Sequence, residues 1–173
     1  VGQDLASFTG GRDVGSLLRD TYHPNIRALR ALEKPVIAAV NGAAAGAGLS
    51  LAMACDVRIA ADSASFVPAF VNVGLVPDSG GSHFLTRILG PARASEWMLS
   101  GRRLAADEAL AWGLVSEVVP AADLPARAAE QAATLAAMAT GAIAMHKRLF
   151  DLAARTTLDE QLQLEAQMQS AAA

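Results

Sequence analysis

The chain has 173 residues, a length that suits one domain with its own hydrophobic core. Its composition, 53% hydrophobic and 18% charged with a net charge of −3, excludes a disordered chain and a strongly basic nucleic-acid-binding protein. No stretch reaches the roughly 18 apolar residues of a membrane span. The single cysteine, Cys55, excludes an intrachain disulfide and a paired-cysteine metal or redox site. We therefore expect a soluble, cytoplasmic protein.

The first half of the chain has the pattern of an α/β fold. Apolar residues recur at helical spacing over residues 13–32, and Pro24 marks a point where a second helix can begin. The runs "PVIAAV" (35–40) and "DVRIAAD" (56–62) are predicted to be neighbouring buried strands. The glycine-rich and then helix-prone stretch between them predicts the order strand, tight turn, helix, strand.

The second half of the chain is different in composition. From Pro91 onward, alanine-rich segments are separated by Gly, Pro or Thr, which predicts a series of helices. The sequence thus predicts an α/β core over residues 1–90, followed by a helical region over residues 91–173. Val1 is not an initiator methionine, so we expect the sequence to begin inside a longer chain.

The stretch "NGAAAGAGLSLA" (41–52) is the first one that indicates a ligand-binding site. Gly42, Gly46 and Gly48 follow a predicted strand and precede a predicted helix, so bare backbone N–H groups can approach a negatively charged atom. A dinucleotide-binding loop is disfavoured because Leu51 stands where a small residue is needed, and the lysine of a mononucleotide loop is missing. Two interpretations stay open: an oxyanion-binding cradle, or small residues that let helix and sheet pack closely.

Asp78 is the second feature, because it is an acid within the otherwise apolar and glycine-rich stretch "VGLVPDSGGSHFL" (73–85). It could cap the helix predicted after it. It could also act as a catalytic acid and base. A helix N-terminus favours the charged form by roughly 0.3–1 kcal/mol, whereas burial can raise a carboxyl pKa by up to about 3–5 units. The apolar neighbours favour a dry site and therefore a raised pKa.

Four segments in order resemble the crotonase superfamily, also called the enoyl-CoA hydratase/isomerase family. They are "VGQDL" (1–5), "EKPVIAAVNGAAAGAGLSLAMACDVRIAADSASF" (33–66), "VGLVPDSGGSHFLTRILG" (73–90) and "LSGRRLAADEALAWGLVSEVVP" (99–120). The resemblance implies a crotonase-type spiral of ββα units with a helical C-terminal region. It also implies an acyl-CoA substrate, no metal or other cofactor, and a homotrimer or a hexamer formed by two trimers. The charge balance and the lack of a long apolar stretch predict no nucleic-acid or membrane partner.

The resemblance also assigns roles to residues. The two backbone N–H groups that hold the thioester oxygen in this family match Val1 and Ala47. The substrate-binding positions include Gly46, Gly48, Phe70, Gly80 and Tyr22.

The acids depart from the pattern of the hydratases in this family, which use two glutamates. Ser50 and Phe70 stand at those two positions, and neither can exchange a carboxyl proton. The remaining acid, Asp78 in "AFVNVGLVPDSGG" (69–81), resembles the branch of isomerases that act on ring-1,2-epoxyphenylacetyl-CoA. The sequence therefore favours an acyl-CoA isomerase of fatty acid or phenylacetate catabolism. The alternatives are a hydratase with one acid and a non-catalytic acyl-CoA-binding or assembly subunit.

Overall fold

The structure is a computed structural model that describes residue 2 and residues 13–172. One three-stranded sheet is formed by β1 (Ile37–Val40), β3 (Val57–Ala61) and β6 (Glu117–Val119), in the order β1-β3-β6 with all strands parallel. In register, Ile37 pairs with Val57, and Ile59 pairs with Glu117. The two neighbouring strands predicted within residues 35–40 and 56–62 are thereby confirmed.

A second small sheet contains β2 (Ala43–Ala45), β4 (Ser65–Val67) and β5 (Leu104–Ala105). β2 runs parallel to β4, and β4 runs antiparallel to β5. β2 lies within the stretch that the sequence analysis interpreted as a tight turn, so the turn there is shorter than expected. Its three alanines give no alternation of polar and apolar residues, which is the pattern that identifies a strand.

The chain repeats a β-β-α pattern between the two sheets. β1 and β2 precede the helix α3 (Ala47–Ala54), and β3 and β4 precede a single 3₁₀ turn (Val71–Val73) and the helix α4 (Gly81–Leu89). Each repeat gives its first strand to one sheet and its second strand to the other. This is the spiral of ββα units expected from the sequence.

The first described helical segment contains a π-helical turn between two α-helical parts. It consists of α1 (Val14–Leu17), a π-helical turn (Leu18–Tyr22) and α2 (His23–Ala31). Pro24 is the second residue of α2, as the sequence predicted for the start of a second helix, and it lies two residues after the π-helical turn in a helical segment that continues through Tyr22. Single π turns inside helices often occur at functional sites.

The core lies between the sheets and the helices α3, α4, α5 (Pro91–Ser100) and α6 (Ala106–Ala111). Large side chains that are fully buried fill it, among them Trp97, Phe66, Leu49, Leu85 and Leu114. The Trp97 ring also meets the Trp112 ring edge to face at 6.0 Å between centroids. Trp97 therefore belongs to the core, and Trp112 packs against it.

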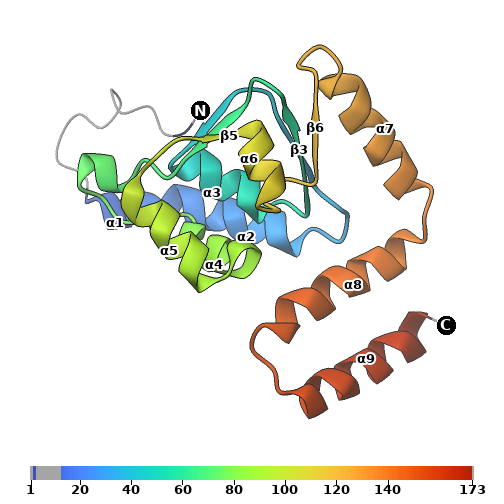
Figure 1. The fold of residues 1–173 in the computed structure, drawn as a ribbon. Coiled ribbons are helices and arrows are strands. Elements are labelled where there is room, and N and C mark those ends of the chain that lie inside the picture. Colours follow the sequence, from blue (N-terminus) through green and yellow to red (C-terminus); the bar gives the residue numbers. More distant parts are fainter. Residues whose placement is uncertain (1, 3–12, 173) are drawn as a thin grey trace.

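The C-terminal part contains α7 (Leu124–Ala136), α8 (Thr140–Ala153) and α9 (Leu158–Ala172), as predicted from the alanine-rich segments. Figure 1 shows α8 and α9 as an antiparallel pair to one side of the sheets. β5 and β6 also fall after residue 91 and complete both sheets, so this part of the chain is not purely helical. Within the described residues, no helix combines the length and apolar character needed to cross a membrane.

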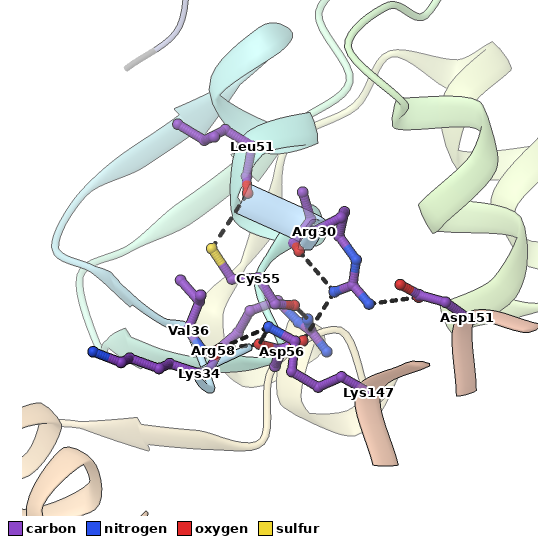
Figure 2. Close-up of polar contacts among 10 residues, drawn as sticks. Arg30, Lys34, Val36, Leu51, Cys55, Asp56, Arg58, Lys147 and Asp151 are labelled. Atoms are coloured by element: carbon purple, nitrogen blue, oxygen red, sulfur yellow. Dashed lines mark hydrogen bonds and ion pairs between the residues drawn. The ribbon is translucent and has the colours of Figure 1, made fainter. Parts of the chain in front are cut away.

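A network of charged side chains joins α8 to α2 and to the start of β3 (Figure 2). The Asp56 carboxylate accepts hydrogen bonds from Arg30 Nη1 at 2.9 Å and from the Val36 amide at 2.8 Å, and it pairs with Lys147 Nζ at 2.7 Å. Arg30 Nη2 also pairs with Asp151 at 2.5 Å. Because Lys147 is buried, the network fixes α8 and the C-terminal end of α2 to the core.

Candidate functional site

A cavity of about 220 Å³ lies between the N-terminal helical segment, the start of α3 and the segment that follows β4. Its walls are mostly apolar, and its polar side chains come from Tyr22 and Asp78. The residues that line it are Gly2, Val14, Leu17, Leu18, Tyr22, Ala45, Gly46, Ala47, Ala69, Phe70, Val73, Leu75 and Asp78. The cavity thus brings together five predicted site residues, which are Tyr22, Gly46, Ala47, Phe70 and Asp78.

The backbone at Gly46 and Ala47 forms one end of this cavity. Gly46 has φ +51° and ψ −120°, a conformation that residues with a side chain rarely adopt, and its amide donates to the carbonyl of Val67 at 3.1 Å. α3 begins at Ala47, so the Ala47 amide has no acceptor within the helix. In the described part of the chain it donates no hydrogen bond. It is available to a ligand in the cavity.

Gly2 lies against the backbone of Ala45 and Gly48. A Cβ atom on Gly2 would overlap the carbonyl oxygen of Ala45 and would lie 3.4 Å from the amide nitrogen of Gly48. Only a glycine fits at such a close approach between two backbone segments. Val1, the other predicted backbone donor, falls outside the described residues, so its role stays a prediction.

A second cavity of about 190 Å³ adjoins the first and extends along the outer side of α3. Gly2, Tyr22 and Ala47 line both cavities, and Gly48, which was predicted to bind substrate, lines the second. Its lining residues are Gly2, Tyr22, Asn25, Ile26, Ala47, Gly48 and Leu51. The two cavities therefore adjoin at Gly2, Tyr22 and Ala47.

The Asp78 side chain does not cap the helix that follows it. α4 begins at Gly81, its N-cap residue is Gly80, and no side chain caps it. The contact between Asp78 and this helix runs through the backbone, where the Gly81 amide donates to the Asp78 carbonyl at 2.8 Å. Asp78 Oδ1 is buried and has no hydrogen-bond partner in the described part of the chain. The capping interpretation of Asp78 is therefore wrong.

The environment of Asp78 changes its acidity. Burial raises the pKa of this carboxyl group above its ordinary value of 3.8, although the side chain of Ser79 and the charge of His23 reduce the rise. Burial and the negative charge of Asp78 both raise the pKa of the Tyr22 phenol, so Tyr22 stays a neutral hydroxyl beside the acid. An acid with a raised pKa, next to an apolar cavity, suits the removal and return of a proton.

The other predicted site residues serve different purposes. Phe70 is buried, lines the cavity and packs against the position that a Cβ on Gly46 would take, at 3.8 Å. Gly80 does not line either cavity among the described residues. Its φ of +84°, and the Phe84 ring atom 2.6 Å from the place of a Cβ, show that it shapes the turn before α4.

Asp78 is the only carboxylate among the described residues that line the two cavities. Ser50 is buried and lines neither cavity, while Phe70 presents an aromatic ring. The described residues also contain no group of three His, Cys, Asp or Glu side chains that could hold a metal ion. Asp78 therefore supplies the single carboxyl group among the described residues that line the first cavity.

Sequence reasoning missed the apolar wall formed by Val14, Leu17 and Leu18. The helical spacing of the leucines was visible in the sequence. Which helical face borders a cavity was not visible, because the opposite wall comes from residues 69–78, about 50 positions further along the chain.

The sequence model of the family described as Enoyl-CoA hydratase/isomerase matches residues 1–173. The chain belongs to this family. It is 44% identical over 174 residues to the 1,2-epoxyphenylacetyl-CoA isomerase of Escherichia coli, covering 98% of this chain and 66% of the relative. It is 43% identical over 169 residues to a probable enoyl-CoA hydratase of Rhodobacter capsulatus, covering 97% of this chain and 66% of the relative.

Solved structures of this enoyl-CoA hydratase/isomerase family show the same fold. A putative member from Mycobacterium abscessus matches with a TM-score of 0.92 and 39% identity over 98% of this chain and 67% of that chain. A putative enoyl-CoA hydratase from Thermobifida fusca, solved in complex with CoA, matches with a TM-score of 0.89 and 34% identity over 98% of this chain and 70% of that chain. The predicted crotonase-type fold is confirmed. The chain spans about two thirds of the length of these relatives.

Proposed function

We propose that this member of the family is an acyl-CoA thioester isomerase that moves a double bond by proton transfer. Asp78 is the base and the acid, and the Ala47 amide holds the thioester oxygen. The observation that carries the proposal is that this carboxylate and this unpaired amide border one cavity, with no second carboxylate among its described lining residues. The identity to an epoxyphenylacetyl-CoA isomerase supports it.

The reaction begins with a thioester whose double bond lies between the β and γ carbons. The ionised Asp78 carboxylate takes a proton from the α carbon, and the electron pair moves onto the thioester oxygen to form a dienolate. The Ala47 N–H donates a hydrogen bond to this oxygen, and Val1 is the proposed second donor. A preorganised donor of this kind contributes on the order of 2.7–4 kcal/mol to the stability of the transition state.

The protonated Asp78 then returns its proton to the γ carbon, and the double bond ends between the α and β carbons. One proton leaves and one proton returns, so the carboxylate is regenerated and no other reactant is consumed. The raised pKa of Asp78 supports the first step, because the carboxylate binds a proton more readily than that of an exposed aspartate. CoA is a part of the substrate, and no further cofactor is needed in this scheme.

The cavity also restricts the acyl group. Apart from Tyr22, Asp78 and two glycines, its described walls are alanine, valine, leucine and phenylalanine side chains, and no lysine or arginine is among the described lining residues. An uncharged apolar acyl chain or ring fits such a wall, because a buried charge without a partner is costly. We therefore propose apolar enoyl-CoA thioesters as the substrate class.

Two further functions compete with isomerisation. A hydratase that uses one acid is suggested by the probable enoyl-CoA hydratase among the relatives, and a non-catalytic acyl-CoA-binding subunit is suggested by Ser50 and Phe70 at the positions of the two hydratase glutamates. A turnover assay of the full-length protein on a panel of 2-enoyl- and 3-enoyl-CoA thioesters distinguishes them. Isomerisation without hydration supports the proposal, hydration supports the hydratase, and binding without turnover supports the subunit.

The family resemblance supports the proposed assembly, and the single cysteine, Cys55, supports the proposed location. We propose a homotrimer, or a hexamer formed by two trimers, in the cytoplasm. Sedimentation velocity of the full-length protein tests the assembly, since a monomer would contradict it.

A further inference from the structure

Ser50 connects the two parts of the proposed site. It lies on α3, one helical turn after Ala47, and its side chain is almost completely buried, with 1% exposed. Its hydroxyl donates a hydrogen bond to the backbone carbonyl of Asp78 at 2.9 Å. The Gly81 amide donates to the same carbonyl at 2.8 Å. The carbonyl of Asp78 is therefore held from α3 and from its own turn.

The approach between α3 and this turn depends on Gly81. A Cβ atom on Gly81 would lie 2.7 Å from the Ser50 hydroxyl, which is closer than real Cβ contacts. The hydroxyl is also 3.4 Å from the Gly46 carbonyl, so its shorter bond goes to Asp78. Ser50 thus contacts the backbone carbonyl of Gly46, which precedes Ala47, and the backbone carbonyl of Asp78.

The turn that carries Asp78 needs such support. Ser79 has φ +52° and Gly80 has φ +84°, and a residue with a side chain at a positive φ costs free energy that the surrounding structure must offset. The Ser79 hydroxyl is buried and makes no hydrogen bond of ordinary geometry in the described part of the chain, and Asp78 Oδ1 makes none either. The position of the carboxyl group therefore depends on how the backbone of Asp78 is held.

We propose that Ser50 is a positioning residue that holds the Asp78 backbone at a fixed place relative to the Ala47 amide, so that the carboxylate reaches the acyl carbons. This inference rests on the proposed isomerase function. Ser50 does not touch the substrate, because it lines neither cavity. It occupies one of the two glutamate positions of the hydratases, but its role here is to orient an acid that stands elsewhere.

Loss of the Ser50 hydroxyl should change catalysis more than binding. Displacement of a reacting group by about 1 Å can lower a rate by about a hundredfold. In Ser50→Ala we expect kcat for trans-3-hexenoyl-CoA to fall by about ten- to a hundredfold, with KM and the Kd of hexanoyl-CoA within about twofold of the wild type. The Gly81 amide still satisfies the Asp78 carbonyl, so the variant is expected to fold.

The test compares the full-length wild type with Ser50→Ala, Gly81→Ala, the double variant, and the control Ser65→Ala. Ser65 is also a buried serine, and its hydroxyl accepts a hydrogen bond from Arg103 at 2.8 Å, away from the cavity. A Cβ at position 81 should push the turn away from the Ser50 hydroxyl. Gly81→Ala should therefore lower kcat by itself and add little in the Ser50→Ala background, because both changes disturb one contact.

A second readout does not depend on turnover. The ¹³C resonance of the Asp78 carboxyl group, titrated in each variant, should show a midpoint closer to 3.8 in Ser50→Ala, because a loosened turn admits water, and an unchanged midpoint in Ser65→Ala. An unchanged midpoint and kcat in Ser50→Ala would overturn the inference, as would equal losses in Ser50→Ala and Ser65→Ala. If the wild type isomerises no enoyl-CoA but Ser50→Ala still shifts the Asp78 midpoint while Ser65→Ala does not, the result would contradict the proposed function and support the placement of Asp78 by Ser50.

Discussion

Ala47 and Asp78 border the same cavity, although Ala47 begins α3 and Asp78 lies 31 positions later, in the turn before α4. The Ala47 amide and Asp78 Oδ1 both lack a hydrogen-bond partner among the described residues. A donor and a base that face one apolar space are the two groups that enolate chemistry of a thioester requires.

Replacement of Asp78 should separate catalysis from stability. Asp78→Asn keeps the shape of the side chain and removes the base, so we expect isomerisation to fall by about 10²–10⁴-fold while hexanoyl-CoA still binds. Because the carboxyl group caps no helix, thermal unfolding should be unchanged or shifted upward. Retained turnover together with a large loss of stability would contradict the role given to Asp78.

The pH dependence of the wild type should report the same group. The base acts in its ionised form, so kcat/KM should rise with pH and reach a plateau, with an apparent pKa above 3.8 because burial disfavours the charge.

The contribution of Asp78 to the free energy of unfolding should change with pH in the opposite direction. A raised pKa in the folded state means that the contribution of Asp78 to stability is full below about pH 3.8 and is lost as the pH rises through the folded-state pKa. A pH–rate profile and urea titrations of the wild type and Asp78→Asn measure both effects, and a rate midpoint at or below 3.8 would contradict them.

The Ala47 amide can be removed by a proline. Ala47 is the first residue of α3, and this position tolerates proline because its amide has no partner in the helix, as at Pro91 in α5. We expect Ala47→Pro to lower kcat by about 10²–10³-fold, the effect of losing one oxyanion donor. The matched variant Ala47→Ser keeps the amide and should retain activity. If both variants fold and have equal kcat values, the amide does not hold the thioester oxygen.

The charged network around Asp56 should matter for stability. Asp56→Ala leaves the buried Lys147 and the partly buried Arg30 without their shared carboxylate, so we expect a loss of about 3–5 kcal/mol in the free energy of unfolding. The control is Glu130→Ala, because Glu130 is 71% exposed in its pair with Arg127, and this change should cost at most about 1 kcal/mol. Urea unfolding of both variants measures the difference, and similar losses would show that the network does not hold α8 and α2 to the core.

Much of the fold could be predicted from the sequence because its signals are local. The β-branched runs over residues 35–40 and 56–62, the glycines before α3 and the alanine-rich segments after Pro91 each report on the element in which they occur. The strands β2, β4 and β5 have two or three residues each, too few for a periodic pattern. Their pairing depends on contacts between distant segments.

The candidate site could be predicted in part for the same reason. Asp78, Gly46, Phe70 and Tyr22 belong to motifs or to a family pattern, and they line one cavity. The bond from Ser50 to the Asp78 carbonyl could not be predicted, because it depends on a backbone turn with two residues at positive φ. The network of Arg30, Asp56 and Lys147 joins positions that are separated by up to 117 residues and leaves no pattern in the sequence.

The fate of a labelled proton tests the role of Asp78 most directly. The full-length protein is incubated with trans-3-hexenoyl-CoA in D₂O, and the products are resolved by NMR. We expect 2-hexenoyl-CoA as the product, with deuterium at the γ carbon to the extent that Asp78 exchanges its proton with solvent before returning it. We expect no conversion above background in Asp78→Asn. A 3-hydroxyhexanoyl-CoA product formed without 2-hexenoyl-CoA, or conversion that persists in Asp78→Asn, would contradict this expectation.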